Sequence, residues 1–421
     1  MNAMLALVDC TSFYVSCEKA FNVALREKPV VVLTNNDACI AALSKEAKVI
    51  GLQRGTPLFQ CRDLIEQHQV VLLSSNYSLY HDMSARVMAN LAAFSPHPLE
   101  VFSIDEAFLD VTHVTAENLA AYGRQIRATV LQRTGIPTVV SLASTKTLTK
   151  VAVEIAKARP EYRHVLAIAC LAEEELDALL ASLGVHEVWG IGPRYAAFLQ
   201  AHGIYTARDL KYADQRWIRK HLTVVGHQTQ LELQGVACLP LEPNVKPRKG
   251  IMRSRTFGRA IESLNELEEA VATYTARAAE QLRSQGSVAS CISVFLQAPQ
   301  YAHEATRTTL FPTAFTPDLI HDALEIVRSL YQHGLRYRKA GVFLSKITRQ
   351  EVLQADLFGT FSLEDHHKKG RLMQVVDWVN KLWGTDTLFF GAQGITRGWQ
   401  MKQLRRSPRY TTRWQEILQI T

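Results

Sequence analysis

The fold of this chain is decided by the stretch Glu100-Val101-Phe102-Ser103-Ile104-Asp105-Glu106-Ala107-Phe108-Leu109-Asp110. Apolar residues flank an Asp-Glu pair on both sides, in a pattern typical of two short strands that meet at the acids. One continuous strand would point Asp105 and Glu106 to opposite faces of a sheet, whereas a tight hairpin lets the two carboxylates converge. Two carboxylates beside a buried sheet repel each other unless a cation lies between them, and a divalent metal ion is the usual cation.

A third carboxylate follows the first apolar run of the chain. Met4-Leu5-Ala6-Leu7-Val8 predicts a buried strand that ends at Asp9. If this strand pairs with the hairpin, then Asp9, Asp105 and Glu106 form a cluster able to hold two Mg²⁺ ions. Metal ions about 3.5–4 Å apart stabilise the attacking and leaving oxygens of a phosphoryl transfer. The alternative is that the acids only keep turns soluble, and short acidic motifs taken alone favour that alternative.

Longer motifs around the acids favour the metal site. Asp9-Cys10-Thr11-Ser12-Phe13-Tyr14 and Ser103-Ile104-Asp105-Glu106-Ala107-Phe108 resemble the paired signature motifs of the Y-family, or lesion-bypass, DNA polymerases. Further stretches resemble the UmuC branch of that family, at residues 28–37, 74–80, 145–150, 401–402 and 407–412. The resemblance covers essentially the whole chain. It implies an α+β multidomain right-hand fold with palm, fingers, thumb and a ferredoxin-like little finger, followed by a UmuC-type C-terminal region.

The resemblance also implies domain boundaries. They are a catalytic palm at 1–19 and 76–165, fingers at 20–75, a thumb at 166–240, a basic linker at 241–249, a little finger at 250–349 and a C-terminal clamp- and partner-binding region at 350–421. Within 250–349 the strand and helix patterns follow the order βαββαβ, which is the split arrangement of ferredoxin-like domains. The first of these helices is predicted to begin at a capping box, Ser263-Leu264-Asn265-Glu266.

Composition excludes several other classes of protein. The 421 residues are too many for one compact core, and the net charge of +7 suits an anionic partner. Seven cysteines without a CxxC spacing indicate reduced thiols in a cytosolic protein. The N-terminus has no basic segment of a signal peptide, and no run of 18 apolar residues predicts a membrane span. With the resemblance, we expect a bacterial, cytoplasmic, nucleoid-associated protein with no membrane partner.

Two of the regions expected to contact the incoming nucleotide lie near the start of the chain. Tyr14 lies five residues after Asp9, the family spacing of a steric gate, where a flat ring beneath the sugar collides with a ribose 2′-OH; Phe13 is the neighbouring candidate. Lys45 and Lys48 are one turn apart on a predicted helix that ends near Gly51. Lys48 matches the basic position of the family's fingers, whereas Lys45 stands where the family has a tyrosine. Both lysines could instead be ordinary solvated side chains.

A second lysine pair opens a predicted helix. Ser144-Thr145-Lys146 predicts its start, with Thr145 as N-cap. Leu148, Val151 and Ile155 form its apolar stripe, and Lys146, Lys150 and Lys157 fall on the other side. The resemblance implies that Lys150 grips the triphosphate of a dNTP, with Lys146 a turn away; the alternative is a solvated lysine face.

Contacts to primer–template DNA and to protein partners are expected elsewhere. Gly190, Gly192 and Arg194 resemble the turn of a helix-hairpin-helix, whose backbone N–H groups bind a DNA phosphate. Arg253 and Arg255 are the expected phosphate contacts of the little finger, and exposed charge on an edge strand is the alternative. The residues Gln354, Leu357 and Phe358 fit the short peptide by which polymerases dock into a sliding clamp. The basic, aromatic tail at 399–414 suits DNA and a protein partner equally.

By resemblance, then, the chain is an error-prone, template-directed DNA polymerase that carries out translesion synthesis in the SOS DNA-damage response, with Asp9, Asp105 and Glu106 as catalytic residues and metal ligands. The implied partners are a processed UmuD-type homodimer, the sliding clamp and a RecA filament. One alternative is a non-catalytic, ImuB-like scaffold that recruits other factors to the clamp, which the presence of all three acids disfavours. Another is a two-metal nuclease, which the gate position and the triphosphate lysines disfavour.

Overall fold

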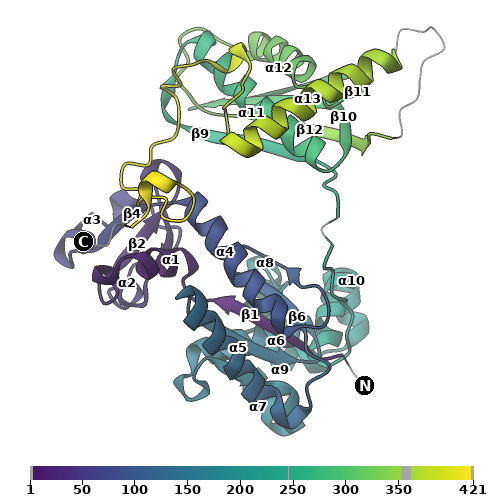
Figure 1. Cartoon of the computed structure of the whole chain (residues 1–421). Helices are drawn as coiled ribbons and strands as arrows, with labels where there is room; N and C mark the ends of the chain where they lie inside the picture. The colour runs from purple at the N-terminus through teal and green to yellow at the C-terminus, as the bar shows by residue number, and fades with distance from the viewer. Residues whose placement is uncertain (1–2, 245, 352–361, 419–421) are drawn as a thin grey trace. The chain divides into compact units, whose positions relative to one another are not determined.

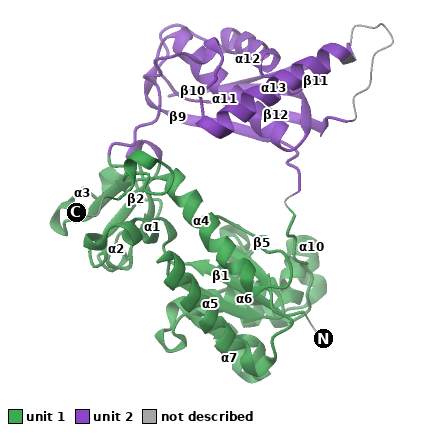
Figure 2. Cartoon of the chain, in the orientation of Figure 1, with its two compact units in different colours: residues 1–34, 38–245, 405–421 green, residues 35–37, 246–404 purple. Residues whose placement is uncertain are grey.

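The computed structural model describes residues 3–244, 246–351 and 362–418, and the chain divides into two compact units (Figure 2). The first unit is built from residues 1–34, 38–245 and 405–421, and the second from residues 35–37 and 246–404. Within the described ranges, no helix combines the length and the apolar character that crossing a membrane requires.

A five-stranded sheet carries the acids of the first unit (Figure 1). Its strands, in spatial order, are β5 (Glu100–Val101), β6 (Glu106–Asp110), β1 (Leu5–Cys10), β7 (Thr138–Ala143) and β8 (Val165–Ala167). β1 lies in the middle, antiparallel to both β6 and β7, and all its residues are buried. The two strands predicted to meet at the Asp-Glu pair are β5 and β6, and they pair antiparallel.

Helices cover both faces of this sheet because its middle strands are apolar on both sides. α1 (Phe13–Phe21), α4 (Tyr77–Leu91) and α5 (Leu119–Thr134) contribute side chains to the core on the side of Ala6 and Val8. α6 (Lys146–Ala158) packs on the side of Leu7. The start predicted for α6 is confirmed, because the Thr145 side chain accepts a hydrogen bond from the Leu148 N–H at 3.2 Å.

A three-stranded sheet lies between α1 and α4 in the sequence. Its strands are β3 (Ile40–Leu43), β2 (Val30–Leu33) and β4 (Val71–Ser74), and the two helices beside them are α2 (Lys45–Val49) and α3 (Arg62–Gln67). The helix predicted to end near Gly51 is therefore only α2, five residues long. The preceding strand β3 was not predicted, since four residues carry too little periodicity to define a strand.

Four helices follow β8: α7 (Glu173–Ala181), α8 (Pro193–Ala201), α9 (Ala207–Tyr212) and α10 (Gln215–Leu233). Gly190, in the turn before α8, has φ of +91°, a backbone conformation that a side chain would strain. Pro193 occupies the first position of α8, where its missing N–H costs no hydrogen bond.

The second unit confirms the βαββαβ order. Its elements are β9 (Ile251–Ile261), α11 (Leu264–Ser284), β10 (Ser287–Ala298), β11 (Tyr301–Thr313), α12 (Thr316–Leu330) and β12 (Tyr337–Arg349), and the sheet order is β11-β10-β12-β9. Two split β-α-β units interleave in this sheet. The capping box predicted for α11 is wrong: the Ser263 side chain makes no cap bond, and Glu266 pairs with Arg259 instead.

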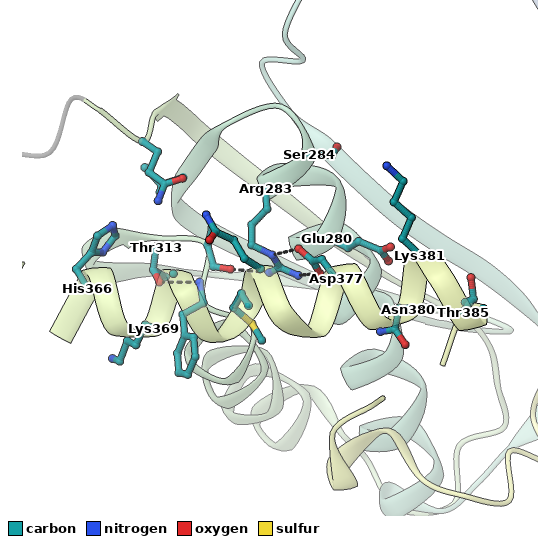
Figure 3. Close-up of a pocket in the computed structure, with 18 residues that line it drawn as sticks. Glu280, Arg283, Ser284, Thr313, His366, Lys369, Asp377, Asn380, Lys381 and Thr385 are labelled. Carbon is teal, nitrogen blue, oxygen red and sulfur yellow. Dashed lines mark hydrogen bonds and ion pairs between the residues drawn. The ribbon is translucent and has the colours of Figure 1, made fainter. Parts of the chain in front are cut away.

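A long helix, α13 (Leu363–Trp383), adds to this unit after the last strand (Figure 3). Arg283 of α11 donates from Nε and Nη2 to the two carboxylate oxygens of Asp377 on α13, each at 2.7 Å. Beside this pair lies a cavity of about 600 Å³, lined also by Glu280, Lys369 and Lys381. A two-bond arginine–carboxylate pair fixes orientation as well as distance, so it holds α13 against α11.

Candidate active site

The strand register brings Asp9 and Glu106 together. They are directly opposite each other in the antiparallel β1–β6 pair, so their side chains share one face of the sheet. That face is the one covered by α6. Lys157 Nζ lies 3.2 Å from Asp9 Oδ2, and Lys150 Nζ lies 2.6 Å from Glu106 Oε2.

Burial and crowding perturb this acidic pair. Burial, helped by the neighbouring Glu106 and opposed by Lys157, raises the pKa of Asp9 to about 7. Burial also acts to raise the pKa of Glu106, but hydrogen bonds with Asp9 and Lys150 outweigh it, so that the pKa of Glu106 is lowered. Of the two carboxylates, Asp9 therefore binds a proton more readily than Glu106.

Asp105 lies one residue before β6, in the hairpin turn. Its backbone carbonyl accepts a hydrogen bond from the Cys10 N–H at 2.8 Å, and its Oδ1 accepts one from the Ser103 hydroxyl at 2.5 Å. Among the described residues, no three His, Cys, Asp or Glu side chains converge as a ready-made metal cluster. The structure thus brings together two of the three predicted acids, while the third is turned onto Ser103.

The donor set nevertheless fits a hard divalent cation. Carboxylate oxygens are the ligands that Mg²⁺ prefers, and Asp9 and Glu106 place theirs on one face of the sheet. Burial and the neighbouring Glu106 raise the pKa of Asp9, and a bound divalent cation would oppose both effects. The lysine ammonium groups of α6 supply part of that charge.

The two gate candidates differ in their surroundings. Phe13 is buried in the core of the first unit, whereas Tyr14 is only half-buried. The Tyr14 ring stacks on Tyr80 with 4.5 Å between centroids, and it meets the edge of Tyr77 at 6.1 Å. Arg54 is close enough to oppose the effect of burial, which raises the pKa of Tyr14. Of the two candidates, Tyr14 retains a surface that a ligand can touch.

The lysine candidates fall into two groups. Lys45 and Lys48 are both exposed on the short helix α2. Lys146 is buried, and its Nζ lies 2.6 Å from Glu100 Oε2. Lys150 is largely buried beside Glu106, with its Nζ 4.3 Å from the centre of the Phe102 ring. Lys146 and Lys150 are therefore not part of a solvated face, whereas Lys157 is exposed.

The remaining candidates are spread over both units. Gly192 and Arg194 are exposed at the first turn of α8. In the second unit, Arg255 is exposed, while Arg253 is half-buried, and burial together with Arg255 lowers its pKa. Gln354, Leu357 and Phe358 lie outside the described residues.

Sequence reasoning assigned no role to three buried polar residues around the site. Glu18, Tyr80 and Glu232 are each at most 2% exposed. Glu18 lies one turn after Tyr14 on α1, so its helical spacing was a usable signal. Glu232 accepts hydrogen bonds from the first turn of α6, a contact that nothing in the local sequence indicates.

Three family models match the chain. The impB/mucB/samB family matches residues 8–154, its C-terminal domain matches residues 248–357, and a domain of unknown function, DUF4113, matches residues 370–420. Protein UmuC of Salmonella typhimurium strain LT2 is 41% identical over 99% of this chain and 100% of its own length. Protein MucB of Escherichia coli is 39% identical over 98% of this chain and 99% of its own length.

Solved structures agree on the fold. A Y-family DNA polymerase chimera of Dbh and Dpo4 matches with a TM-score of 0.65 and 23% identity, covering 82% of this chain and 99% of the chimera. An insertion ternary complex of Dbh DNA polymerase matches with a TM-score of 0.56 and 22% identity, covering 82% of this chain and 99% of that one.

Proposed function

Because the chain belongs to the impB/mucB/samB family, the UmuC branch of the Y-family DNA polymerases, we propose that it joins nucleotides to a primer at Asp9, Asp105 and Glu106. Membership of this branch makes it an error-prone, DNA-directed DNA polymerase of translesion synthesis, which binds DNA and dNTPs and depends on divalent metal. We further propose that the metal is Mg²⁺ and that two ions bind. The observation that carries the proposal is the pairing of buried Asp9 with half-buried Glu106, each with a lysine beside it.

The three acids are proposed to hold the metal ions. Bound there, Mg²⁺ supplies Lewis acidity toward the primer hydroxyl and the triphosphate. Asp9 and Glu106 share a face of the sheet, so a rigid pair of neighbouring strands orients both carboxylates. Asp105 lies in the hairpin turn, and it would bind metal in place of the hydrogen bond that it now accepts from the Ser103 hydroxyl.

The lysines and the gate are proposed to handle the incoming dNTP. Lys150 is fixed between Glu106 and the Phe102 ring, so its ammonium group is oriented before a triphosphate arrives. Lys48 and Lys45 provide exposed positive charge from α2, and Lys146 supports the hairpin through Glu100. Tyr14 lies beneath the sugar and excludes the ribose 2′-OH.

The proposal extends to DNA and to partner proteins. The exposed first turn of α8, with Gly192 and Arg194, offers N–H groups and a cation to a phosphate of the duplex. Gly190 provides the turn, and Arg255, with half-buried Arg253 beside it, offers further contacts from β9. A sliding clamp, a processed UmuD-type homodimer and a RecA filament are the expected partners, with clamp docking through Gln354, Leu357 and Phe358.

Primer extension tests the catalytic assignment. Wild type, Asp105→Asn and Glu106→Gln are compared on undamaged and abasic templates, with Mg²⁺, clamp, RecA filament and processed UmuD-type partner supplied. Glu66→Gln, an exposed carboxylate of the same unit, is the matched control. Nucleotide-dependent growth of the primer in wild type and Glu66→Gln only is the expected result.

Other outcomes select the alternatives. Equal inactivity of wild type and the acid variants, with DNA and clamp still bound, would identify a non-catalytic scaffold. Shortening of the primer that requires the acids but no dNTP would identify a nuclease. Extension by Asp105→Asn at the wild-type rate would remove Asp105 from the metal site.

A further inference from the structure

A buried carboxylate outside the acidic pair connects the tail of the chain to the core. Glu18 on α1 is 2% exposed, and burial raises its pKa. Its Oε1 atom accepts two hydrogen bonds, from the Tyr80 hydroxyl at 2.7 Å and from the Ser407 hydroxyl at 3.0 Å. No ion pair to Glu18 occurs in the part of the chain that the structure describes, so these two hydroxyl groups are what stabilises its charge.

Ser407 belongs to a segment that is docked along its length. We call residues 405–417 the C-terminal strap. Asn76 Nδ2, at the N-cap of α4, donates to the Ser407 hydroxyl at 2.9 Å and to the backbone carbonyls of Ser407 and Pro408 at 3.1 Å each. The backbone of Arg405 exchanges hydrogen bonds with Ser74, at 3.1 and 2.9 Å.

Further along, the strap packs through a ring and closes on itself. Tyr410 stacks on Phe21 of α1, with 5.0 Å between centroids. Arg409 donates to Glu416 from its backbone N–H at 2.6 Å and from Nε at 3.0 Å. These contacts occupy two members of the basic, aromatic tail within the protein itself, so Arg409 and Tyr410 are not free to bind DNA.

The same contacts reach the candidate steric gate. Tyr80 is fully buried, and its ring lies nearly parallel to that of Tyr14, with a 13° angle between the planes. A continuous series of contacts therefore runs from Asn76 and Ser407 of the strap interface, through Glu18 and Tyr80, to Tyr14. All of these residues belong to the first unit.

We propose that the C-terminal strap is a specificity element of the polymerase site: Ser407, acting through Glu18 and Tyr80, fixes the ring of Tyr14 where it excludes ribonucleotides. The inference rests on the proposed role of Tyr14 as the gate. Ser407 and Tyr80 are positioning residues, because neither touches the nucleotide in this scheme.

Small movements of the Tyr14 ring matter because steric repulsion changes steeply with distance. A ring that shifts by a fraction of an ångström changes a clash with a 2′-OH into a tolerated contact, whereas a 2′-CH₂ fits in both cases. The Tyr14 ring is half-buried, and one of its faces stacks on Tyr80. Loss of the Ser407 donor leaves Glu18 buried with one hydrogen bond fewer, so Glu18 and the Tyr80 hydroxyl rearrange together.

The test measures sugar discrimination in the full-length protein. The ratio of kcat/KM for CTP to kcat/KM for dCTP opposite a template guanine is determined for wild type, Ser407→Ala, Tyr80→Phe and Tyr14→Ala. Ser407→Thr retains the hydroxyl and serves as conservative rescue. Thr412→Ala removes an exposed hydroxyl from the same strap and is the matched control.

Ser407→Ala and Tyr80→Phe are expected to raise the ratio about threefold to tenfold, the range for loss of one hydrogen bond, with dCTP still used. Ser407→Thr and Thr412→Ala should match wild type. In a Tyr14→Ala background, Ser407→Ala should change the ratio no further, because the gate through which it acts is gone.

Three negative results are distinguishable. If Tyr14→Ala raises the ratio but Ser407→Ala and Tyr80→Phe leave it at the wild-type value, the strap proposal is overturned and the gate assignment stands. If Tyr14→Ala itself leaves the ratio unchanged, the gate assignment is wrong, and the strap proposal falls with it. A rise for Thr412→Ala equal to that for Ser407→Ala would also overturn the proposal, since it would reflect general loosening of the strap.

Discussion

Replacing Glu232 with alanine tests whether the lysine helix α6 depends on α10 for its position. Glu232 is fully buried, and its Oε2 atom accepts from the Thr147 N–H and hydroxyl, both at 2.8 Å. Its Oε1 atom accepts from the backbone N–H groups of Cys238 at 3.1 Å and Leu239 at 2.9 Å. Alanine removes all four acceptor contacts at once.

The free-energy cost of Glu232→Ala depends on which of the four donors can find another acceptor. The Thr147 N–H is buried in the first turn of α6, and losing a charged acceptor there costs about 1.5–3 kcal/mol. The Thr147 hydroxyl can rotate, and the half-buried Cys238 and Leu239 N–H groups reach water, so together they add about 1 kcal/mol. The total of about 2.5–4 kcal/mol makes local opening of this turn more frequent by about 70- to 900-fold.

Hydrogen exchange measures this opening directly. Amides of residues 145–150 in full-length Glu232→Ala should exchange faster by that factor, while exposed Glu66→Ala should leave them unchanged. Exchange in Glu232→Gln should be faster than in wild type and slower than in Glu232→Ala, because an amide keeps one acceptor oxygen where the carboxylate has two. Exchange in Glu232→Ala within about threefold of wild type would refute the reasoning, since the buried N–H would then have found another acceptor.

Three further predictions concern the site and its stability. Lys150→Ala should lower kcat/KM for dNTP about tenfold to hundredfold in steady-state primer extension, because it removes an oriented cation. Lys146→Ala should chiefly lower the thermal unfolding temperature, because the half-buried Glu100 loses its ion-pair partner. Arg194→Ala should reduce the salt dependence of DNA binding by about one unit of log–log slope in a fluorescence titration, equally for all template sequences. Burial raises the pKa of Glu18 above that of a solvated glutamate, so the folded state binds this proton more tightly than the unfolded state does. Stability therefore falls as pH rises from the ordinary glutamate pKa to the raised pKa of the folded state. Glu18→Gln should remove that slope and gain stability over wild type at neutral pH in thermal melts; equal slopes for both proteins would contradict the raised pKa.

Local signals predicted much of this architecture. The acidic hairpin, the start of α6 at Thr145 and the βαββαβ order were predicted because periodicity and capping depend on residues close in sequence. The capping box predicted at Ser263 was wrong because Glu266 pairs with Arg259 of the preceding strand β9 instead of with the helix N-terminus. No local pattern could predict the strap, because the Ser407–Glu18 hydrogen bond joins residues 389 positions apart.

Glu18 and Glu232 differ in how many of their carboxylate oxygens accept hydrogen bonds, and that difference explains why only Glu232 requires a carboxylate. At Glu18 both donors converge on Oε1, so the second oxygen makes no hydrogen bond with them and an amide can take its place. At Glu232 each oxygen accepts two hydrogen bonds, and an amide nitrogen would confront the N–H groups of Cys238 and Leu239. The charge of Glu232 therefore follows from the geometry of its donors, whereas the charge of Glu18 costs stability that its hydrogen bonds do not require.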